Sequence, residues 1–321
     1  MSIGMGLIGL GRHGARYAKH LLDGVPGCRL AAVSRQDAQA GERFAKEHGV
    51  PFCADWRDLL RRSDVQAVLI VTPPSLNREI CLAAAGAGKA LLIEKPLACS
   101  TAEAKEMVAA ARASGVPLMT AQTLRFTPVL RRLREQLATI GQVEYFSLCM
   151  RAERPPHAWL DQKDKAGGGV VLEIGIHHFD LLRCLTGQEA VEVRAETARR
   201  HTKQVEDLAQ VRFTLASGAA CFVELSRVSG GRLCRAEAIG QKGQLMADVG
   251  PGTLTRIEGW KVVDVESVPD RPTIEIVLET FARSLKDKTP MPVSGEDGLR
   301  AVAMAEAAYR SAALGKPVDI G

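Results

Sequence analysis

The stretch Gly4-Met5-Gly6-Leu7-Ile8-Gly9-Leu10-Gly11-Arg12-His13-Gly14 decides the fold expected for this chain. Its apolar first half reads as a strand, its second half fits G-x-G-x-x-G, and a helix-like stretch over 12–22 follows. This context predicts a dinucleotide-binding turn, because the glycines permit a tight turn and the N–H groups that open the helix can face a pyrophosphate. The alternative is a glycine turn that only helps the helix to pack on the strand.

Short apolar runs and helix-like stretches alternate over the first 120 residues. The predicted strands are 4–8, 29–33, 67–71, 90–93 and 116–119. The predicted helices are 12–22, 37–48, 75–85 and 101–114, and the last opens with Ser100 and Glu103 at capping-box spacing. This alternation indicates βαβ units and a parallel sheet of Rossmann type.

The pattern changes near residue 121. A helix opened by Thr127 and Pro128 and a segment after Gly167-Gly168-Gly169 are followed by longer, partly alternating runs. These predicted strands are 191–197, 208–215, 219–225, 235–239 and 256–265, and the closing helices are 273–285 and 295–314. We therefore expect an α/β fold with two domains, 1–121 and 122–321. The second should be α+β with a large, mostly antiparallel open sheet.

Composition excludes several classes of protein. The formal net charge of the 321 residues is +5, and no basic run accompanies it, so we expect no nucleic-acid partner. No apolar run approaches the roughly 20 residues that span a bilayer, so we expect no membrane partner. The eight cysteines contain no C-x-x-C pair, which predicts neither a disulfide framework nor a metal site and favours a cytoplasmic protein with reduced thiols.

The end of the second strand bears on the choice of cofactor. Ser34 and Arg35 stand about 20 residues beyond the glycines, where an NAD site usually carries Asp or Glu. A hydroxyl with a guanidinium suits a 2′-phosphate, so we favour NADP, with NAD possible. Arg35 could instead be a surface residue, and Asp37 is better explained as a helix cap.

The fifth strand ends in Glu94-Lys95-Pro96, which places Lys95 at the edge of the sheet where ligands bind. Thr72-Pro73 ends the preceding strand in a similar way. A surface lysine paired with Glu94 is the alternative. The predicted cofactor-binding residues are Gly9, Gly11, Arg12, His13, Gly14, Ser34, Arg35, Thr72, Pro73, Asn77, Glu94 and Lys95.

A second polar pattern follows the triple glycine. Glu173, His177 and Asp180 are spaced to share one face of a helix, with apolar residues around them. A carboxylate with an imidazole could also hold a metal, but no third ligand at suitable spacing is evident, so we expect none.

Together these motifs resemble the glucose–fructose oxidoreductase / inositol dehydrogenase family, Gfo/Idh/MocA, over essentially the whole chain. The resemblance rests on the glycine turn, Thr72-Pro73-Pro74, Glu94-Lys95-Pro96, the 173–180 motif after the triple glycine, and Ser294-Gly295-Glu296-Asp297-Gly298. It implies hydride transfer between NAD or NADP and a carbinol or carbonyl of a sugar, polyol or related small molecule. It also implies a homodimer or homotetramer built on the open sheet.

The resemblance implies that Lys95 and His177 are the catalytic pair and that the acidic residue before the histidine holds substrate hydroxyls. Here that residue is Glu173 where Asp is common, and Asn77 stands where a histidine is frequent. Lys95 would stabilise the developing alkoxide and His177 would exchange the proton, although either could do so.

The predicted substrate-binding residues are Lys95, Arg125, Trp159, Glu173 and His177. The basic stretch that contains Arg151, Arg154 and His157 could bind an acidic sugar, or it could be a solvated loop. Two other functions remain open. One is a non-catalytic NADP-binding sensor, and the other is a carbonyl or dihydrodiol-type reductase that acts on compounds other than sugars.

Overall fold

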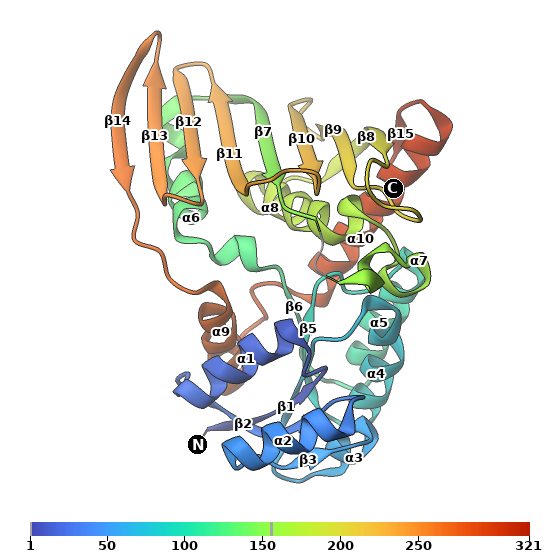
Figure 1. Cartoon of the computed structure of the whole chain (residues 1–321). Coiled ribbons are helices and arrows are strands. Elements are labelled where there is room, and N and C mark those ends of the chain that lie inside the picture. The colour runs from blue at the N-terminus through green and yellow to red at the C-terminus, as the bar shows by residue number, and fades with distance from the viewer. Residues whose placement is uncertain (1, 155–156) are drawn as a thin grey trace. The chain divides into compact units, whose positions relative to one another are not determined.

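The computed structural model describes residues 2–154 and 157–321, which form two compact units (Figure 1). The first comprises Met1–Gln122 and Pro272–Leu299, and the second comprises Thr123–Arg271 and Arg300–Gly321. The sequence suggested one boundary near residue 121. The predicted second domain, 122–321, differs from the second unit, because residues 272–299 belong to the first unit.

A six-stranded parallel sheet in the order β3-β2-β1-β4-β5-β6 forms the first unit, as the alternating pattern predicted. Its strands are β1 Ile3–Ile8, β2 Cys28–Ser34, β3 Phe52–Cys53, β4 Ala67–Ile70, β5 Ala90–Glu94 and β6 Leu118–Ala121. Only β3 was absent from the expectation, because two residues give no readable period. The strand order reverses between β1 and β4, the position where open α/β sheets bind ligands.

Six helices belong wholly to the first unit: α1 Arg12–Asp23, α2 Ala38–His48, α3 Trp56–Arg61, α4 Pro74–Gly86, α5 Thr101–Ala113 and α9 Thr273–Asp287. Asp37 caps α2 through the amide of Ala40 at 3.0 Å, and Ser100 caps α5, both as expected. Past α9, Val293 accepts a 3.0 Å hydrogen bond from the amide of Thr120, so residues 293–294 cover the edge of β6.

The second unit contains a nine-stranded sheet in the order β14-β13-β12-β11-β7-β10-β9-β8-β15. Its strands are β7 Val143–Arg151, β8 Ala190–Ala198, β9 Leu208–Leu215, β10 Ala220–Ser226, β11 Leu233–Gly240, β12 Gly243–Asp248, β13 Thr253–Glu258, β14 Lys261–Ser267 and β15 Val318–Asp319. Among the described strand pairs of this nine-stranded sheet, only β7 and β10 run parallel. This confirms a large, mostly antiparallel sheet.

Four features of this sheet differ from the sequence expectation, and one of them is β15, whose two residues give no readable period. The run 256–265 is two strands, because Gly259 adopts a positive φ of 55° and turns the chain between β13 and β14. β7 was missed because polar and apolar residues do not alternate cleanly along it, and β12 because its glycine-bounded sequence is short.

The helices of the second unit are short, apart from those flanking the sheet. They are η1 Thr123–Phe126, α6 Pro128–Gln136, η2 Leu137–Ile140, η3 Ala158–Asp161, α7 Lys163–Ala166, the π-helical η4 Val171–Gly175 and α8 Ile176–Thr186. Helix α10 Gly295–Leu314 begins in the first unit and continues into the second. Figure 1 shows α6 and α8 along one face of the sheet. On its other face a groove of about 510 Å³ opens, lined by strand residues such as Arg194, Arg212 and Phe222.

All eight cysteines are free thiols, and all of them lie in the described ranges. Within those ranges the longest apolar helical segments fall short of what a bilayer crossing needs.

Candidate active site

The glycine turn has one crowded side and one open side. Gly9 has a φ of 99°, and an added Cβ would lie 2.3 Å from the carbonyl oxygen of Val71. At Gly14 the added Cβ would lie 2.1 Å from the Gly9 oxygen, so this glycine allows α1 to approach the strand. At Gly11 the same atom would meet nothing within 4 Å. The open side at Gly11, where no described side chain caps α1, fits a diphosphate at the helix N-terminus.

The end of β2 carries the residues expected to contact the adenine ribose. Ser34 is buried, and its carbonyl oxygen accepts from the amide of Gly9 at 3.0 Å, which ties β2 to the glycine turn. Arg35 is partly exposed and lies 3.8 Å from the Asp37 carboxylate. At this separation the guanidinium is oriented by Asp37 and keeps donors for a further anion.

The Glu94 carboxylate, at the end of β5, is buried and surrounded by donors. Its Oε1 accepts from Tyr17 Oη at 2.5 Å and lies 2.9 Å from His13 Nε2, and its Oε2 accepts from the backbone amide of Lys95 at 3.0 Å. Burial alone would raise the pKa of Glu94, but attraction to His13 and the hydrogen bonds of His13 and Tyr17 outweigh it and lower the pKa. Glu94 is therefore a buried carboxylate anion that accepts a hydrogen bond from the backbone amide of Lys95.

A second network holds the next turn. Asn77 is buried, and its amide nitrogen donates to the carbonyl oxygens of Pro96 and Leu97 at 3.1 and 3.2 Å. Its oxygen accepts from Thr72 Oγ1 at 2.8 Å. Asn77 thus connects the end of β4 to the Glu94-Lys95-Pro96 turn. Both polar atoms of its side-chain amide form hydrogen bonds with other residues of the protein. Together with the contacts of Glu94, this fixes the backbone on either side of Lys95.

Sequence reasoning missed two residues of this sheet edge. Gln122 directly follows β6, whose Ala121 pairs with Glu94, and it is completely buried. Neither polar atom of its amide has a hydrogen-bond partner in the described ranges. The Oγ1 atom of Thr120 has no hydrogen-bond partner in those ranges either. Because a buried amide costs free energy unless it is bonded, this position calls for a polar ligand or water. A glutamine at the carboxyl end of a parallel strand was the available signal.

In the second unit, the triple glycine and the helix after it are anchored by Glu206. Its carboxylate accepts from the amides of Gly169 and Val171 at 3.2 and 3.0 Å and from Tyr309 Oη at 2.8 Å. Burial raises the pKa of Glu206, and these hydrogen bonds counteract part of that rise. The anchor fixes the start of the π-helical turn that leads to His177, which is the second residue of α8 and partly exposed.

Glu173 lies in the π-helical turn and not in α8, so the expected α-helical face over 173–180 is altered there. Its carboxylate forms a two-pronged ion pair with Arg227, which follows β10. Arg227 also donates to the carbonyl oxygen of Glu153 at 3.2 Å. A substrate that contacts Glu173 would therefore meet a carboxylate that is already paired with Arg227.

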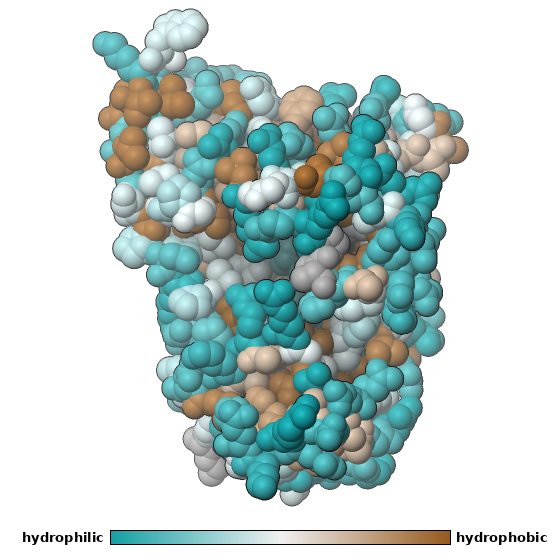
Figure 2. Space-filling view, viewed as in Figure 1, coloured by the Kyte–Doolittle hydropathy of each residue, from teal (hydrophilic) through white to brown (hydrophobic). Residues whose placement is uncertain are grey.

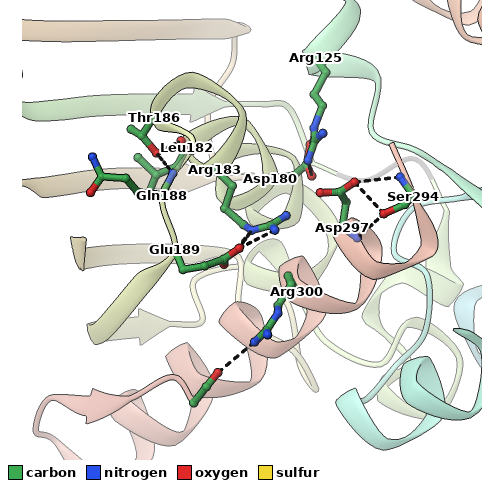
Figure 3. A network of polar contacts seen from close by, with 11 residues as sticks. Arg125, Asp180, Leu182, Arg183, Thr186, Gln188, Glu189, Ser294, Asp297 and Arg300 are labelled. Atoms are coloured by element: carbon green, nitrogen blue, oxygen red, sulfur yellow. Dashed lines mark hydrogen bonds and ion pairs between the residues drawn. The ribbon is translucent and has the colours of Figure 1, made fainter. Parts of the chain in front are cut away.

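Asp180, the third member of the motif, is 1% exposed and faces Arg125 (Figure 3). Arg125 Nε and Nη2 each donate to one carboxylate oxygen at 2.6 Å. This is a bidentate pair that joins η1 to α8. Arg125, which the sequence predicted to contact substrate, therefore forms an ion pair with Asp180, three residues after His177 in the chain.

The other basic residues considered for the substrate also have protein partners. Arg151 pairs with Glu224 on the neighbouring strand at 2.8 Å, and Arg154 lies 2.9 Å from His201 Nδ1. Trp159 is half-buried in η3, as is His157 just before it. No metal-type cluster of three His, Cys, Asp or Glu side chains occurs among residues 2–154 and 157–321.

His178, next to His177, is a core residue. It is 2% exposed, its Nδ1 lies 3.4 Å from the Ile174 carbonyl oxygen, and its Nε2 has no partner among the described residues. Burial lowers the pKa of His178 to about 4.

This burial predicts acid sensitivity. Below about pH 6.5 the unfolded chain protonates His178 while the folded chain does not, so the free energy of unfolding should fall by about 3 kcal/mol as the pH drops from 7 to 4. Urea unfolding at several pH values will measure this fall. In His178→Leu the part of the fall due to this residue should be absent, and an unchanged profile would assign the acid sensitivity to other groups.

Two family models match the chain. The model described as an oxidoreductase family with an NAD-binding Rossmann fold matches residues 3–122, and the GFO/IDH/MocA C-terminal domain model matches residues 130–246.

Relatives match over nearly the full length. The chain is 30% identical to scyllo-inositol 2-dehydrogenase (NAD(+)) of Bacillus subtilis (strain 168), covering 98% of this chain and 95% of the relative. It is also 30% identical to 1,5-anhydro-D-fructose reductase of Ensifer adhaerens, covering 92% of each. The crystal structure of an oxidoreductase domain protein from Kribbella flavida superposes with a TM-score of 0.90 at 27% identity and full coverage of both chains.

Proposed function

The chain belongs to the GFO/IDH/MocA oxidoreductase family, and we propose on that premise that it transfers a hydride between a nicotinamide dinucleotide and a carbinol or carbonyl of a sugar or polyol. The observation that carries the proposal is the position of Lys95. It lies at the carboxyl edge of an NAD-binding sheet, and its backbone is fixed by Glu94 on one side and by Asn77 on the other. Relatives that act on inositols and on an anhydro sugar support the substrate class.

The roles of the side chains follow from the charge that develops in the reaction. When bound, the nicotinamide accepts or supplies the hydride. Lys95 donates a hydrogen bond to the substrate oxygen and stabilises its negative charge. His177 exchanges the hydroxyl proton, because an imidazole can gain and lose a proton near neutral pH. Glu173, bound to Arg227, orients the substrate next to His177.

The dinucleotide fits the residues present. The open side of Gly11 leaves room for the diphosphate, and the unpaired amide of Gln122 offers both a donor and an acceptor to a carboxamide. We further propose that NADP is preferred over NAD. No carboxylate ends β2, and the Arg35 guanidinium can bind a 2′-phosphate.

Replacing Arg35 tests this preference. We expect Arg35→Ser to raise the Kd for NADPH about tenfold, the loss of one charged hydrogen-bond partner, and to leave the Kd for NADH within about twofold. Arg43→Ser is the control, because Arg43 is an exposed residue of α2. This change should alter neither the Kd for NADPH nor the Kd for NADH. Equal affinity of the parent for NADPH and NADH, measured by fluorescence titration, would contradict the preference.

Oxidation of NADPH and NADH against keto-sugars, inososes, uronates and simple aldehydes, with the reverse assay on polyols, tests the function itself. Turnover of a keto-sugar or inosose is expected. Tight cofactor binding without turnover of any compound in this panel would favour a sensor, and turnover of aldehydes alone would favour a carbonyl reductase.

We also propose that two or more copies associate through the open face of the nine-stranded sheet. Tyr145 and Phe222 pack against each other and are exposed there. Hydrophobic side chains also gather at the β14 edge of the sheet in Figure 2, where Val262, Val263 and Val265 are exposed. Such patches mark interfaces. Light scattering should give a mass at least twice 34.5 kDa, and a monomer would contradict the proposal. The eight free thiols support a cytoplasmic location.

A further inference from the structure

A histidine inside the phosphate-binding turn is held by two buried side chains of the same unit. His13 lies in the first turn of α1, with its side chain 44% exposed, and its Nε2 is 2.9 Å from Glu94 Oε1. Tyr17, one turn later, is completely buried, donates to the same oxygen at 2.5 Å, and packs edge-on against the imidazole at 5.5 Å between ring centroids. The ring of His13 is therefore fixed in position although part of it faces solvent.

These contacts also fix the tautomer of His13. Glu94 is a carboxylate, and an ionised carboxylate only accepts hydrogen bonds. The hydrogen between Nε2 and Oε1 must then reside on Nε2 in both charge states of the ring. Nδ1 is the nitrogen that is left to gain or lose a proton, and it lies on the side of the ring away from the Nε2–Glu94 contact.

We propose that His13 Nδ1 takes up a proton when the dinucleotide binds and donates it as a hydrogen bond to the diphosphate, with Glu94 and Tyr17 as positioning residues. The inference rests on the proposed binding of NAD(P) at this turn. Gly11, two residues earlier, leaves open space at the N-terminus of α1, and His13 lies in the first turn of that helix, next to the proposed position of the diphosphate. The imidazolium would then lie between two anions, Glu94 and the diphosphate, which is the arrangement that favours its charged form.

The other titratable side chains near this cluster are Tyr17, Arg16, Lys95 and Arg12. Burial, together with the charge of Glu94, raises the pKa of Tyr17 well above 10, so the phenol stays neutral. The charge of Arg16 acts on Tyr17, and the charge of Lys95 acts on Glu94. Arginine and lysine side chains do not ordinarily change charge between pH 5 and 8. Imidazole is the side chain that changes charge between pH 5 and 8.

Proton-linked binding has a definite sign. If the complex holds one more proton than the free protein, affinity is highest at low pH and falls as the pH rises, by at most tenfold per pH unit. We expect the Kd for ADP-ribose to rise about fivefold or more between pH 6 and pH 8. Calorimetry in buffers of different ionisation enthalpy should show an uptake of up to one proton at neutral pH.

ADP-ribose and NADH are the appropriate ligands for this test. Both contain the diphosphate, whereas NADP(H) carries a phosphomonoester whose own pKa near 6 would add a second proton. ADP-ribose lacks the nicotinamide, so a linkage shared by both ligands identifies the diphosphate as the partner of His13.

Three variants separate the outcomes. His13→Gln should bind ADP-ribose more weakly at pH 6, with no proton uptake and a Kd that no longer depends on pH. His13→Lys restores a fixed cation and should bind tightly at both pH values without proton uptake. His20→Gln, in the last turn of the same helix, is the matched control and should keep the pH dependence of the parent.

Two results would overturn the inference while leaving the proposed cofactor intact. One is ADP-ribose binding with no proton uptake by the parent protein, and the other is an uptake that persists in His13→Gln. Failure of both ADP-ribose and NADH to bind the parent at any pH would instead remove the proposed dinucleotide function, so the two failures are distinguishable.

Discussion

We expect Lys95→Ala to lower turnover at least about 100-fold while the Kd for the dinucleotide stays within about threefold of the parent value. Losses of this size are typical when a positioned acid, base or charge-stabilising group is removed. Cofactor binding should survive because the contacts of Glu94 and Asn77 reach the backbone of residues 95–97 and do not depend on the ammonium group. Steady-state kinetics and fluorescence titration measure the two quantities.

The design includes two controls. Lys105→Ala removes an exposed lysine from α5 and should change neither turnover nor binding. Lys95→Arg keeps the charge but not the geometry, and it should recover only part of the loss. Near-parental turnover in Lys95→Ala would exclude Lys95 from the chemistry, and a large loss of cofactor affinity would make it a binding residue.

The second large effect concerns stability. Arg125→Ala should lower the free energy of unfolding by about 3–5 kcal/mol, because the change leaves the Asp180 carboxylate buried without its guanidinium. Asp180 is 1% exposed and receives two hydrogen bonds at 2.6 Å from Arg125, so solvent cannot compensate. Urea unfolding at pH 7, followed by circular dichroism, measures the loss.

Two comparisons isolate the cause. The double variant Arg125→Leu with Asp180→Leu removes both charges and should recover most of the stability. Arg151→Ala breaks the exposed pair with Glu224 and should cost less than about 1 kcal/mol. If Arg125→Ala costs no more than Arg151→Ala, Asp180 does not depend on this guanidinium.

The parallel half of the fold follows from local sequence because each of its signals is local. The glycine turn, the cap at Ser100 and the strand periods all lie within a few residues of what they specify. The strand β3 could not be foreseen, since two residues carry no period. The division of 256–265 depends on the positive φ of Gly259, which sequence composition does not reveal.

The candidate residues were foreseen better than their partners. Motif spacing identified Glu94, Glu173 and His177, but ion pairing is decided by the fold. Arg227 is 54 residues from Glu173, Asp180 is 55 from Arg125, and His13 is 81 from Glu94. Nothing within the motifs shows that Glu173 binds a guanidinium or that Asp180 is buried.

The return of residues 272–299 to the first unit limits how this protein can be divided. Met119 forms a β-bridge with Ser294, and the carbonyl oxygen of Val293 accepts a hydrogen bond from the amide of Thr120. The outer edge of β6 is therefore covered by a segment that lies more than 170 residues later in the sequence. A gene fragment that stops after Gln122 would leave that strand as a bare edge prone to self-association. Anyone exchanging the nucleotide-binding half between relatives must therefore transplant two pieces of coding sequence rather than one.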